Sequence, residues 1–273
     1  KQFISIFKDE YINAKGTESI KKLFGVERAH FDYSKPTELI RDLMIMADVK
    51  DDDIVMDFFA GSGTTAQSVL EMNMEDNGNR RFICIQLPEI TEEETEASKA
   101  GYKTIADFTK DRIKKVIDRI KNENKSQKKL KEDSYEPDLG FRVFKLDRSN
   151  FKKWDNSTEE LQTSLTEHVE QIKTSANPED VLYEILIKDG FELTTKIETT
   201  QLKGKDVFSI ENNLLLICLD EKLDLDLFKE MKKLDPHLVI VLDKGFKDND
   251  QLKTNAVQTL GKNSDEEYIL RSI

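Results

Sequence analysis

Residues 54–65 read IVMDFFAGSGTT, and this stretch predicts the architecture of the first half of the chain. The apolar run at 54–59 has the length of a strand. The glycine-rich loop 61–65 then leads into residues 66–74, which have the composition of a helix. A second apolar run follows at 81–87. Strands joined by a helix run parallel with a right-handed crossover, so we expect an α/β unit here.

Further helix patterns lie on both sides of this unit. A turn at Pro36 leads into residues 39–47, where apolar side chains recur at i, i+3 and i+4. The patterns also predict a short strand at 2–7, a helix at 16–25 that ends in a glycine, a surface insertion at 89–99 and a helix at 105–120. The amphipathic pattern of that last helix ends at a polar run, residues 121–133, which we interpret as a domain boundary. Residues 1–136 therefore form the first predicted domain.

The remaining residues, 137–273, have their own alternation of strand and helix patterns and form a second, smaller predicted α/β domain. Strands are predicted at 141–146, 193–202, 207–211, 214–219, 238–242 and 268–273, and helices at 158–173, 178–189, 223–234 and 248–260. The second and third of these strands are spaced as a hairpin. Two domains also agree with a length of 273 residues, since a domain has roughly 150.

The composition is that of a highly charged globular chain. Charged residues make up 35%, against about 25% in an average domain, and the net charge is −12. A negative balance argues against a nucleic-acid-binding domain, which is usually basic. Residues 110–131 are the exception, with ten basic and three acidic residues, so the rest of the chain carries −19. Two interpretations of this stretch stay open: a solvated helix face, or a helix that faces phosphate or a partner.

The cysteine and histidine pattern predicts neither a disulfide framework nor a metal site. Cys84 and Cys218 lie in separate apolar runs, no CxxC is present, and the three histidines are isolated. We interpret both thiols as core residues in a reducing, cytoplasmic setting. No apolar run approaches the roughly 20 residues of a membrane-spanning helix. Because the chain begins with Lys1, we expect it to be a part of a longer protein.

The glycine loop has the chemistry of a cofactor site. Glycines let the backbone approach a ligand, and the start of a helix directs free N–H groups at an anionic group. Gly61, Gly63 and Ala66 also satisfy G-x-G-x-x-A, so NAD is one candidate. However, Asp57 precedes the loop and suits a cationic amino group. Gln86 stands where NAD proteins usually place an acid for the ribose. S-adenosyl-L-methionine, with its ammonium, carboxylate and adenosine, fits better, and a glycine turn without a ligand is the third possibility.

Two stretches carry a more specific resemblance. Residues 57–65, DFFAGSGTT, resemble motif I of the amino-group DNA methyltransferases, and residues 31–40, FDYSKPTELI, resemble their motif X. Motif X ahead of motif I is the order of the beta class. Within that class the residues of these stretches are similar to those of the modification (Mod) subunit of type III restriction–modification systems. Further similar stretches lie at 79–89 and 245–255.

The resemblance implies a function and a set of site residues. The fold would be a partial Rossmann-like methyltransferase domain, S-adenosylmethionine the methyl donor and adenine N6 in a specific DNA sequence the acceptor, with cytosine N4 as the alternative. The implied cofactor-binding residues are Asp57, Phe58, Phe59, Gly61, Ser62, Gly63, Thr64, Ser34, Lys35, Pro36 and Gln86. Of these, Lys35 is either a partner for the cofactor carboxylate or a plain surface lysine. Gln86 would stand at the ribose.

The sequence lacks one motif that these enzymes use. They flip the target base out of the duplex and hold its amine with an (Asp/Asn/Ser)-Pro-Pro-aromatic motif. The five prolines, at 36, 88, 137, 178 and 236, are nowhere adjacent. We therefore expect a C-terminal part of a Mod subunit that is inactive alone and has no catalytic residue. Residues 137–273 would be an assembly domain for a second Mod subunit or the restriction subunit, while DNA would be contacted mainly by regions that are absent here.

Overall fold

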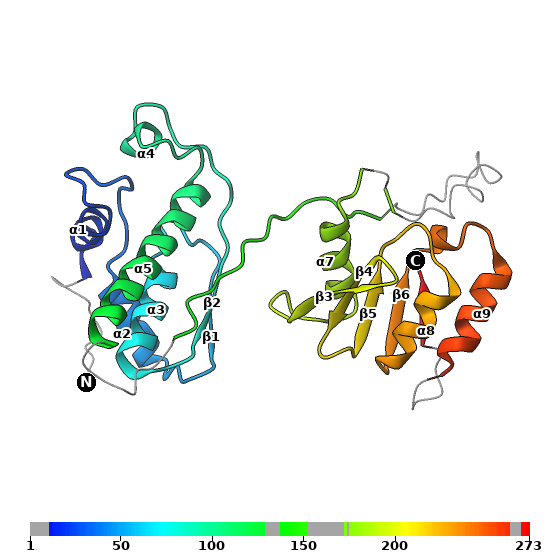
Figure 1. The fold of residues 1–273 in the computed structure, drawn as a ribbon. Coiled ribbons are helices and arrows are strands. Elements are labelled where there is room, and N and C mark those ends of the chain that lie inside the picture. The colour runs from blue at the N-terminus through cyan, green and yellow to red at the C-terminus, as the bar shows by residue number, and fades with distance from the viewer. Residues whose placement is uncertain (1–10, 129–136, 152–171, 174, 263–268) are drawn as a thin grey trace. The chain divides into compact units, whose positions relative to one another are not determined.

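The computed structural model describes residues 11–128, 137–151, 172–173, 175–262 and 269–273. The chain divides into two compact units, Lys1–Phe141 and Arg142–Ile273 (Figure 1). The strand predicted at 2–7 and nearly all of the helix predicted at 158–173 lie outside the described residues. The boundary predicted between 136 and 137 adjoins residues 129–136, which the structure does not describe either.

The first unit contains the predicted strand–loop–helix–strand arrangement. Its helices are α1 (Asn13–Phe24), α2 (Thr37–Met46), α3 (Thr64–Asp76), α4 (Glu96–Lys99) and α5 (Ile105–Lys128), and its strands are β1 (Ile54–Asp57) and β2 (Arg81–Cys84). The two strands pair in parallel and α3 connects them. The mixed α/β character of this unit is therefore confirmed.

One face of this two-stranded sheet is covered by helices (Figure 1). Val55, Phe82 and Cys84 pack against buried side chains of α2, α3 and α5. Because side chains alternate along a strand, the neighbouring residues point to the other face. Those neighbours are exposed and apolar: Ile54, Met56, Ile83, Ile85 and Leu87. The first unit thus presents an apolar sheet face to solvent.

The second unit is built on a five-stranded sheet. Its strands are β3 (Ile197–Leu202), β4 (Lys205–Ile210), β5 (Leu215–Cys218), β6 (Leu238–Val241) and β7 (Leu270–Ser272), in that order across the sheet. Its helices are α7 (Pro178–Lys188), α8 (Leu225–Lys233) and α9 (Asp250–Leu260), with a 3-10 turn, η3 (Asp243–Phe246). β3, β4 and β5 pair antiparallel, so the predicted hairpin is confirmed, whereas β5, β6 and β7 pair in parallel.

Helices cover both faces of this sheet. Leu216 and Cys218 of β5 pack against α8 and α9, while Leu215 and Ile217 pack against α7. All four residues of β5 are buried, which explains why this strand is a continuous apolar run in the sequence rather than an alternating one. The unit therefore has three layers with a core on each side of the sheet.

The strand predicted at 141–146 is wrong, since these residues belong to no strand in the described structure. Side chains hold the segment instead: the Arg142 guanidinium donates to the carbonyl oxygens of Leu193 and Thr195, and the Phe144 ring packs edge-on against Tyr183. An alternating apolar pattern becomes a strand only where a partner strand is available, and none of the described strands pairs with this segment.

Replacing Phe228 by alanine tests the core between the sheet and α8. The ring is fully buried and stacks on Phe246 with the centroids 5.9 Å apart, so the Phe228→Ala cavity should lower the free energy of unfolding by about 3–5 kcal/mol. Urea unfolding followed by circular dichroism measures the change. Leu146→Ala is the control, because that side chain is fully exposed and its loss should cost no more than about 0.5 kcal/mol. Equal effects of the two variants would contradict this packing.

Candidate cofactor site

The glycine loop between β1 and α3 adopts a backbone that favours glycine. Gly61 and Gly63 have φ values of +50° and +79°, in the left-handed region. A Cβ atom at Gly63 would lie 3.0 Å from Cγ2 of Thr109 on α5, and the Thr109 hydroxyl donates to the Gly61 carbonyl at 2.5 Å. The loop is therefore shaped by its own conformation and by close packing on α5.

Asp57 lies at the end of β1 and closes the loop on itself. One carboxylate oxygen accepts from the backbone N–H of Phe59 at 3.0 Å, and the other accepts from the Thr65 hydroxyl at 2.6 Å. The side chain is half-buried. A carboxylate has about four lone-pair sites, so Asp57 can hold the loop and still accept from a cationic amino group.

The two phenylalanines that follow Asp57 are exposed. Phe59 has 88% of its surface accessible, and Phe58 is also exposed. Large apolar side chains at the start of a glycine loop offer contact surface to a ligand or a covering segment.

Gln86 follows β2 and reaches the same loop. Its Oε1 accepts from the Gly61 backbone N–H at 2.7 Å, and its Nε2 donates to the Leu87 carbonyl at 3.1 Å. Because β1 and β2 are parallel, the residues after both strands meet at one edge of the sheet. Gln86 therefore supports the loop backbone directly.

The segment before α2 also joins the loop. The Ser34 hydroxyl is buried and lies 2.8 Å from the Ser62 hydroxyl, the Thr64 hydroxyl donates to the Lys35 carbonyl at 3.2 Å, and Pro36 is buried too. The Lys35 side chain is exposed and donates to Asn13 Oδ1 on α1 at 3.1 Å. Of the predicted residues, Ser34 is thus bonded to the loop and Pro36 is buried, whereas the Lys35 ammonium is bonded to α1.

The predicted site residues do not include Thr65, Thr109 or Arg112, of which Arg112 on α5 makes the most hydrogen bonds. Arg112 was predicted either on a solvated face or facing phosphate or a partner, and both interpretations are wrong for it because its side chain is fully buried. Desolvation lowers the pKa of its guanidinium to about 10, so it stays charged at neutral pH. The signal in the sequence was its spacing: Phe108, Arg112 and Val116 follow one another at four-residue intervals, and all three are fully buried.

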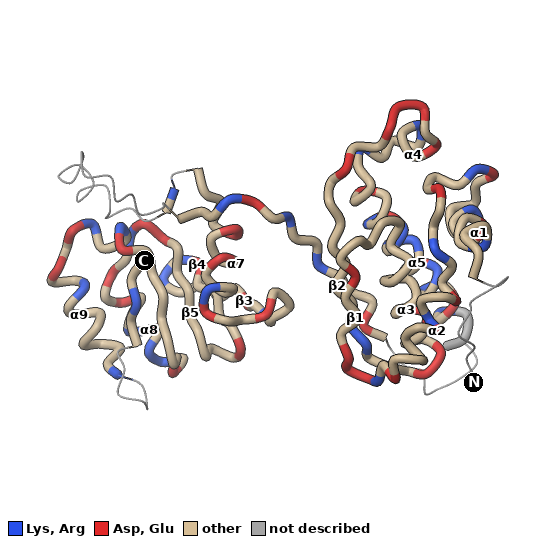
Figure 2. The backbone as a smooth tube through the Cα atoms, turned by 180° about the vertical axis from the view of Figure 1, so that it is seen from behind, with Lys and Arg blue, Asp and Glu red and all other residues tan. Residues whose placement is uncertain are grey.

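Other basic residues of α5 do form a solvated face. Lys114, Lys121 and Lys125 are exposed, and basic positions are spread along the helix in Figure 2. Arg119 makes an ion pair with Glu71 on α3. The solvated-face interpretation is therefore right for these lysines.

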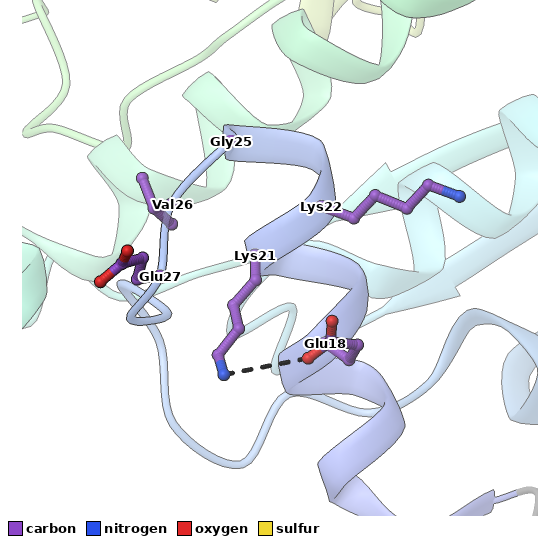
Figure 3. Close-up of a pocket in the computed structure, with 6 residues that line it drawn as sticks. All are labelled: Glu18, Lys21, Lys22, Gly25, Val26 and Glu27. Atoms are coloured by element: carbon purple, nitrogen blue, oxygen red, sulfur yellow. Dashed lines mark ion pairs between the residues drawn. The ribbon is translucent and has the colours of Figure 1, made fainter.

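A shallow hollow lies elsewhere in the first unit, on α1 and the turn after it (Figure 3). It is lined by Glu18, Lys21, Lys22, Gly25, Val26 and Glu27. The Lys21 ammonium and the Glu18 carboxylate form an ion pair at 3.8 Å across it. It contains none of the predicted cofactor residues, so it is not the candidate site.

Comparison of the sequence with known proteins shows which class of protein this chain resembles. Residues 1–100 match the DNA methylase family. The chain is 33% identical over 216 residues to the type III restriction-modification enzyme EcoPI Mod subunit of Escherichia phage P1, covering 78% of this chain and 31% of that protein. It is 30% identical over 252 residues to the EcoP15I Mod subunit of Escherichia coli, covering 88% and 35%.

A type II methyltransferase of Klebsiella pneumoniae, M.KpnI, is 33% identical over 108 residues, 40% of this chain and 25% of that protein. Together these matches identify the chain as a Mod-type methyltransferase sequence, which confirms the resemblance of residues 31–40 and 57–65. The chain spans about a third of the length of the Mod subunits that it matches. In the described part of the chain, no helix is both long and apolar enough to cross a membrane.

The thiols provide a test of the packing behind the loop. Burial, together with the charge of Asp57, raises the pKa of the Cys84 thiol to about 12, and burial also raises the pKa of Cys218. A raised pKa leaves less reactive thiolate at pH 8. We expect Ellman's reagent to react with the native chain at least about a hundredfold more slowly than with the chain unfolded in guanidinium. A Cys218→Ala variant isolates Cys84, and fast reaction of that variant would show that the covered face of β2 is open.

Proposed function

We propose that residues 1–136 form part of a Rossmann-like methyltransferase domain that binds S-adenosyl-L-methionine at the glycine loop. The observation that carries this proposal is the meeting of three segments: Asp57 at the end of β1, the left-handed turn at Gly61 and Gly63, and the buried start of α2 at Ser34. A glycine loop at the carboxyl edge of parallel strands is a common place for a nucleotide cofactor.

Each part of the site has a chemical role in this proposal. The Asp57 carboxylate accepts from the ammonium group of the cofactor. The N–H groups at the start of α3 favour binding of the cofactor's own carboxylate. The exposed Phe58 and Phe59 supply apolar contact, and Ser62, Gly63 and Thr64 shape the floor. Lys35 would have to leave Asn13 to reach the carboxylate, and Gln86 would have to share its amide between Gly61 and the ribose.

When bound, S-adenosylmethionine supplies the methyl group, and we propose adenine N6 in DNA as the acceptor for the whole protein. The relatives carry the names of Mod subunits and of a methyltransferase, which supports this class of reaction. The present chain has no adjacent prolines and so no (Asp/Asn/Ser)-Pro-Pro-aromatic motif. We therefore propose that it binds cofactor but does not transfer a methyl group on its own. Cytosine N4 is the alternative acceptor.

Calorimetry with S-adenosylmethionine tests the site. Asp57→Ala removes the acceptor for the ammonium, and Gly61→Asp places a side chain and a negative charge over the loop. Each should weaken binding by at least about tenfold. Asp118→Ala, an exposed carboxylate on α5, is the control for the first variant. Gly101→Asp controls for the second, because Gly101 has φ +91° and no atom within 4 Å of an added Cβ.

Unchanged affinity in both site variants would contradict the assignment. Binding of NAD rather than S-adenosylmethionine would favour the oxidoreductase alternative.

We also propose that the second unit serves assembly, with a second Mod subunit or with the restriction subunit. It has a core of its own, and it exposes apolar side chains at Val143, Leu146 and Ile187. The Mod relatives are named as subunits, which supports a role in a larger particle.

Size-exclusion chromatography with light scattering tests this role on the full chain and on residues 142–273. We expect either a dimer or, with purified restriction subunit added, a complex. Val143→Asp combined with Leu146→Asp should weaken that association, because it puts charge on the exposed apolar segment. A strict monomer that binds no restriction subunit would leave the second unit without this role.

A further inference from the structure

Arg112 makes a dense set of hydrogen bonds beneath the glycine loop. Its Nη1 donates to the Ser62 hydroxyl at 2.7 Å and the Ser62 carbonyl at 3.1 Å, to the Thr64 hydroxyl at 3.0 Å and to the Ser34 hydroxyl at 3.1 Å. Its Nε donates to Gln67 Oε1 on α3 at 2.8 Å. A single guanidinium therefore contacts the loop, the segment before α2 and the helix that follows the loop.

The guanidinium of Arg112 is fully buried and has no ion-pair partner among the described residues. Its Nη2 is also without a hydrogen-bond partner there. Its main counter-charge is Glu71, which acts on it from beyond Gln67. Burying a cation without an ion-pair partner is costly, so a plain packing role would be served better by an apolar side chain. The acceptors that surround it are hydroxyl and carbonyl oxygens of the two segments that resemble motifs X and I, together with the amide oxygen of Gln67 on α3.

The geometry points to Arg112 as the positioning residue of the cofactor site, a role that rests on the proposed function. We propose that it locks the segment at Ser34 to the loop at Ser62–Thr64, so that the two halves of the cofactor cradle hold one arrangement before the cofactor arrives. Thr109, one turn earlier on α5, adds a second anchor through the Gly61 carbonyl. The cradle is then preorganised by a helix that does not itself line it.

Preorganisation predicts that losing Arg112 harms binding more than it harms folding. Without the guanidinium, the hydroxyls of Ser34, Ser62 and Thr64 keep only each other, at 2.8, 3.2 and 3.4 Å, and the Lys35 carbonyl, to which Thr64 and Ser34 donate at 3.2 and 3.4 Å. The loop can then open without unfolding α3 or α5. A residue that only filled space would change affinity and stability together.

Arg112→Met is the test variant, and Arg119→Met is its matched control. Both arginines lie on α5 and both reach α3, Arg112 at Gln67 and Arg119 at Glu71, but Arg119 has no hydrogen bond to the loop among the described contacts. Three quantities are measured on the full chain: the melting temperature, the affinity for S-adenosylmethionine by calorimetry, and hydrogen exchange of the Gly61 and Gly63 amides without cofactor. Those two amides donate to Gln86 and to the Ala60 carbonyl in the native loop.

We expect Arg112→Met to weaken cofactor affinity at least about tenfold and to raise loop exchange at least about tenfold, while Arg119→Met stays within about twofold of the native chain in both. If Arg112→Met does not fold, Ser34→Ala replaces it, because this change removes one Arg112 contact and leaves the Ser62, Thr64 and Gln67 bonds. It should move both quantities in the same direction by about threefold.

The outcomes separate this inference from the proposed function. If the affinity for S-adenosylmethionine and the hydrogen exchange of the loop amides change only in proportion to the melting temperature across all variants, Arg112 is a packing residue and the inference is overturned. If the native chain binds no S-adenosylmethionine, the proposed function fails, and loop exchange alone then decides whether Arg112 positions the loop. Unchanged loop exchange in Arg112→Met overturns the inference in either case.

Discussion

The first unit depends on one constraint, the left-handed backbone of the loop between β1 and α3. Gly61 and Gly63 turn the chain sharply enough for the loop to lie against Thr109 of α5 and for the Gly61 N–H to donate to Gln86. Any larger residue at position 63 would be pushed away from α5. Asp57, Gln86 and the start of α3 meet at one edge because this turn is tight and because the strands on either side of the helix are parallel.

Beneath that loop lies the buried positive charge of Arg112. Its hydrogen-bond acceptors are uncharged hydroxyl, carbonyl and amide oxygens, and no carboxylate among the described residues pairs with it. Arg112 joins residues that are far apart in the sequence, since it lies 78 positions from Ser34 and 50 from Ser62. Its Nη1 contacts three hydroxyls while its Nε contacts an amide oxygen on α3, so the planar guanidinium spans the loop and α3 at once, which the single nitrogen of an ammonium group cannot do. α3 begins at Thr64, one of the residues that Arg112 contacts, so the helix start favours an anionic group at this part of the loop, while Asp57 suits a cationic one.

The two units differ in how far their sheets are covered. In the second unit helices lie on both faces, and β5 is apolar throughout because it is buried on both sides. In the first unit Val55 faces helices while Ile54 and Met56 are exposed, although all three have the same apolar character. The sequence predicted the strand, but nothing local distinguishes a covered face from an open one. The segment at 141–146 failed for a related reason, because strand pairing depends on a neighbour that the pattern does not contain.

Within the described residues, and apart from the strand predicted at 141–146, the sequence by itself determined the order of strands and helices. It likewise determined the glycine turn, the hairpin of β3 and β4, and the family, since these depend on local periodicity, turn residues and short motifs. It also brought Asp57 and Gln86 to one edge through the parallel strands. Only the tertiary structure decided that Ser34 lies on Ser62, that Lys35 is bonded to Asn13, and that Arg112 is a buried hub rather than part of a solvated face. These last features depend on contacts between distant segments, and the environment of a charged side chain is set by what packs over it rather than by its neighbours in the chain.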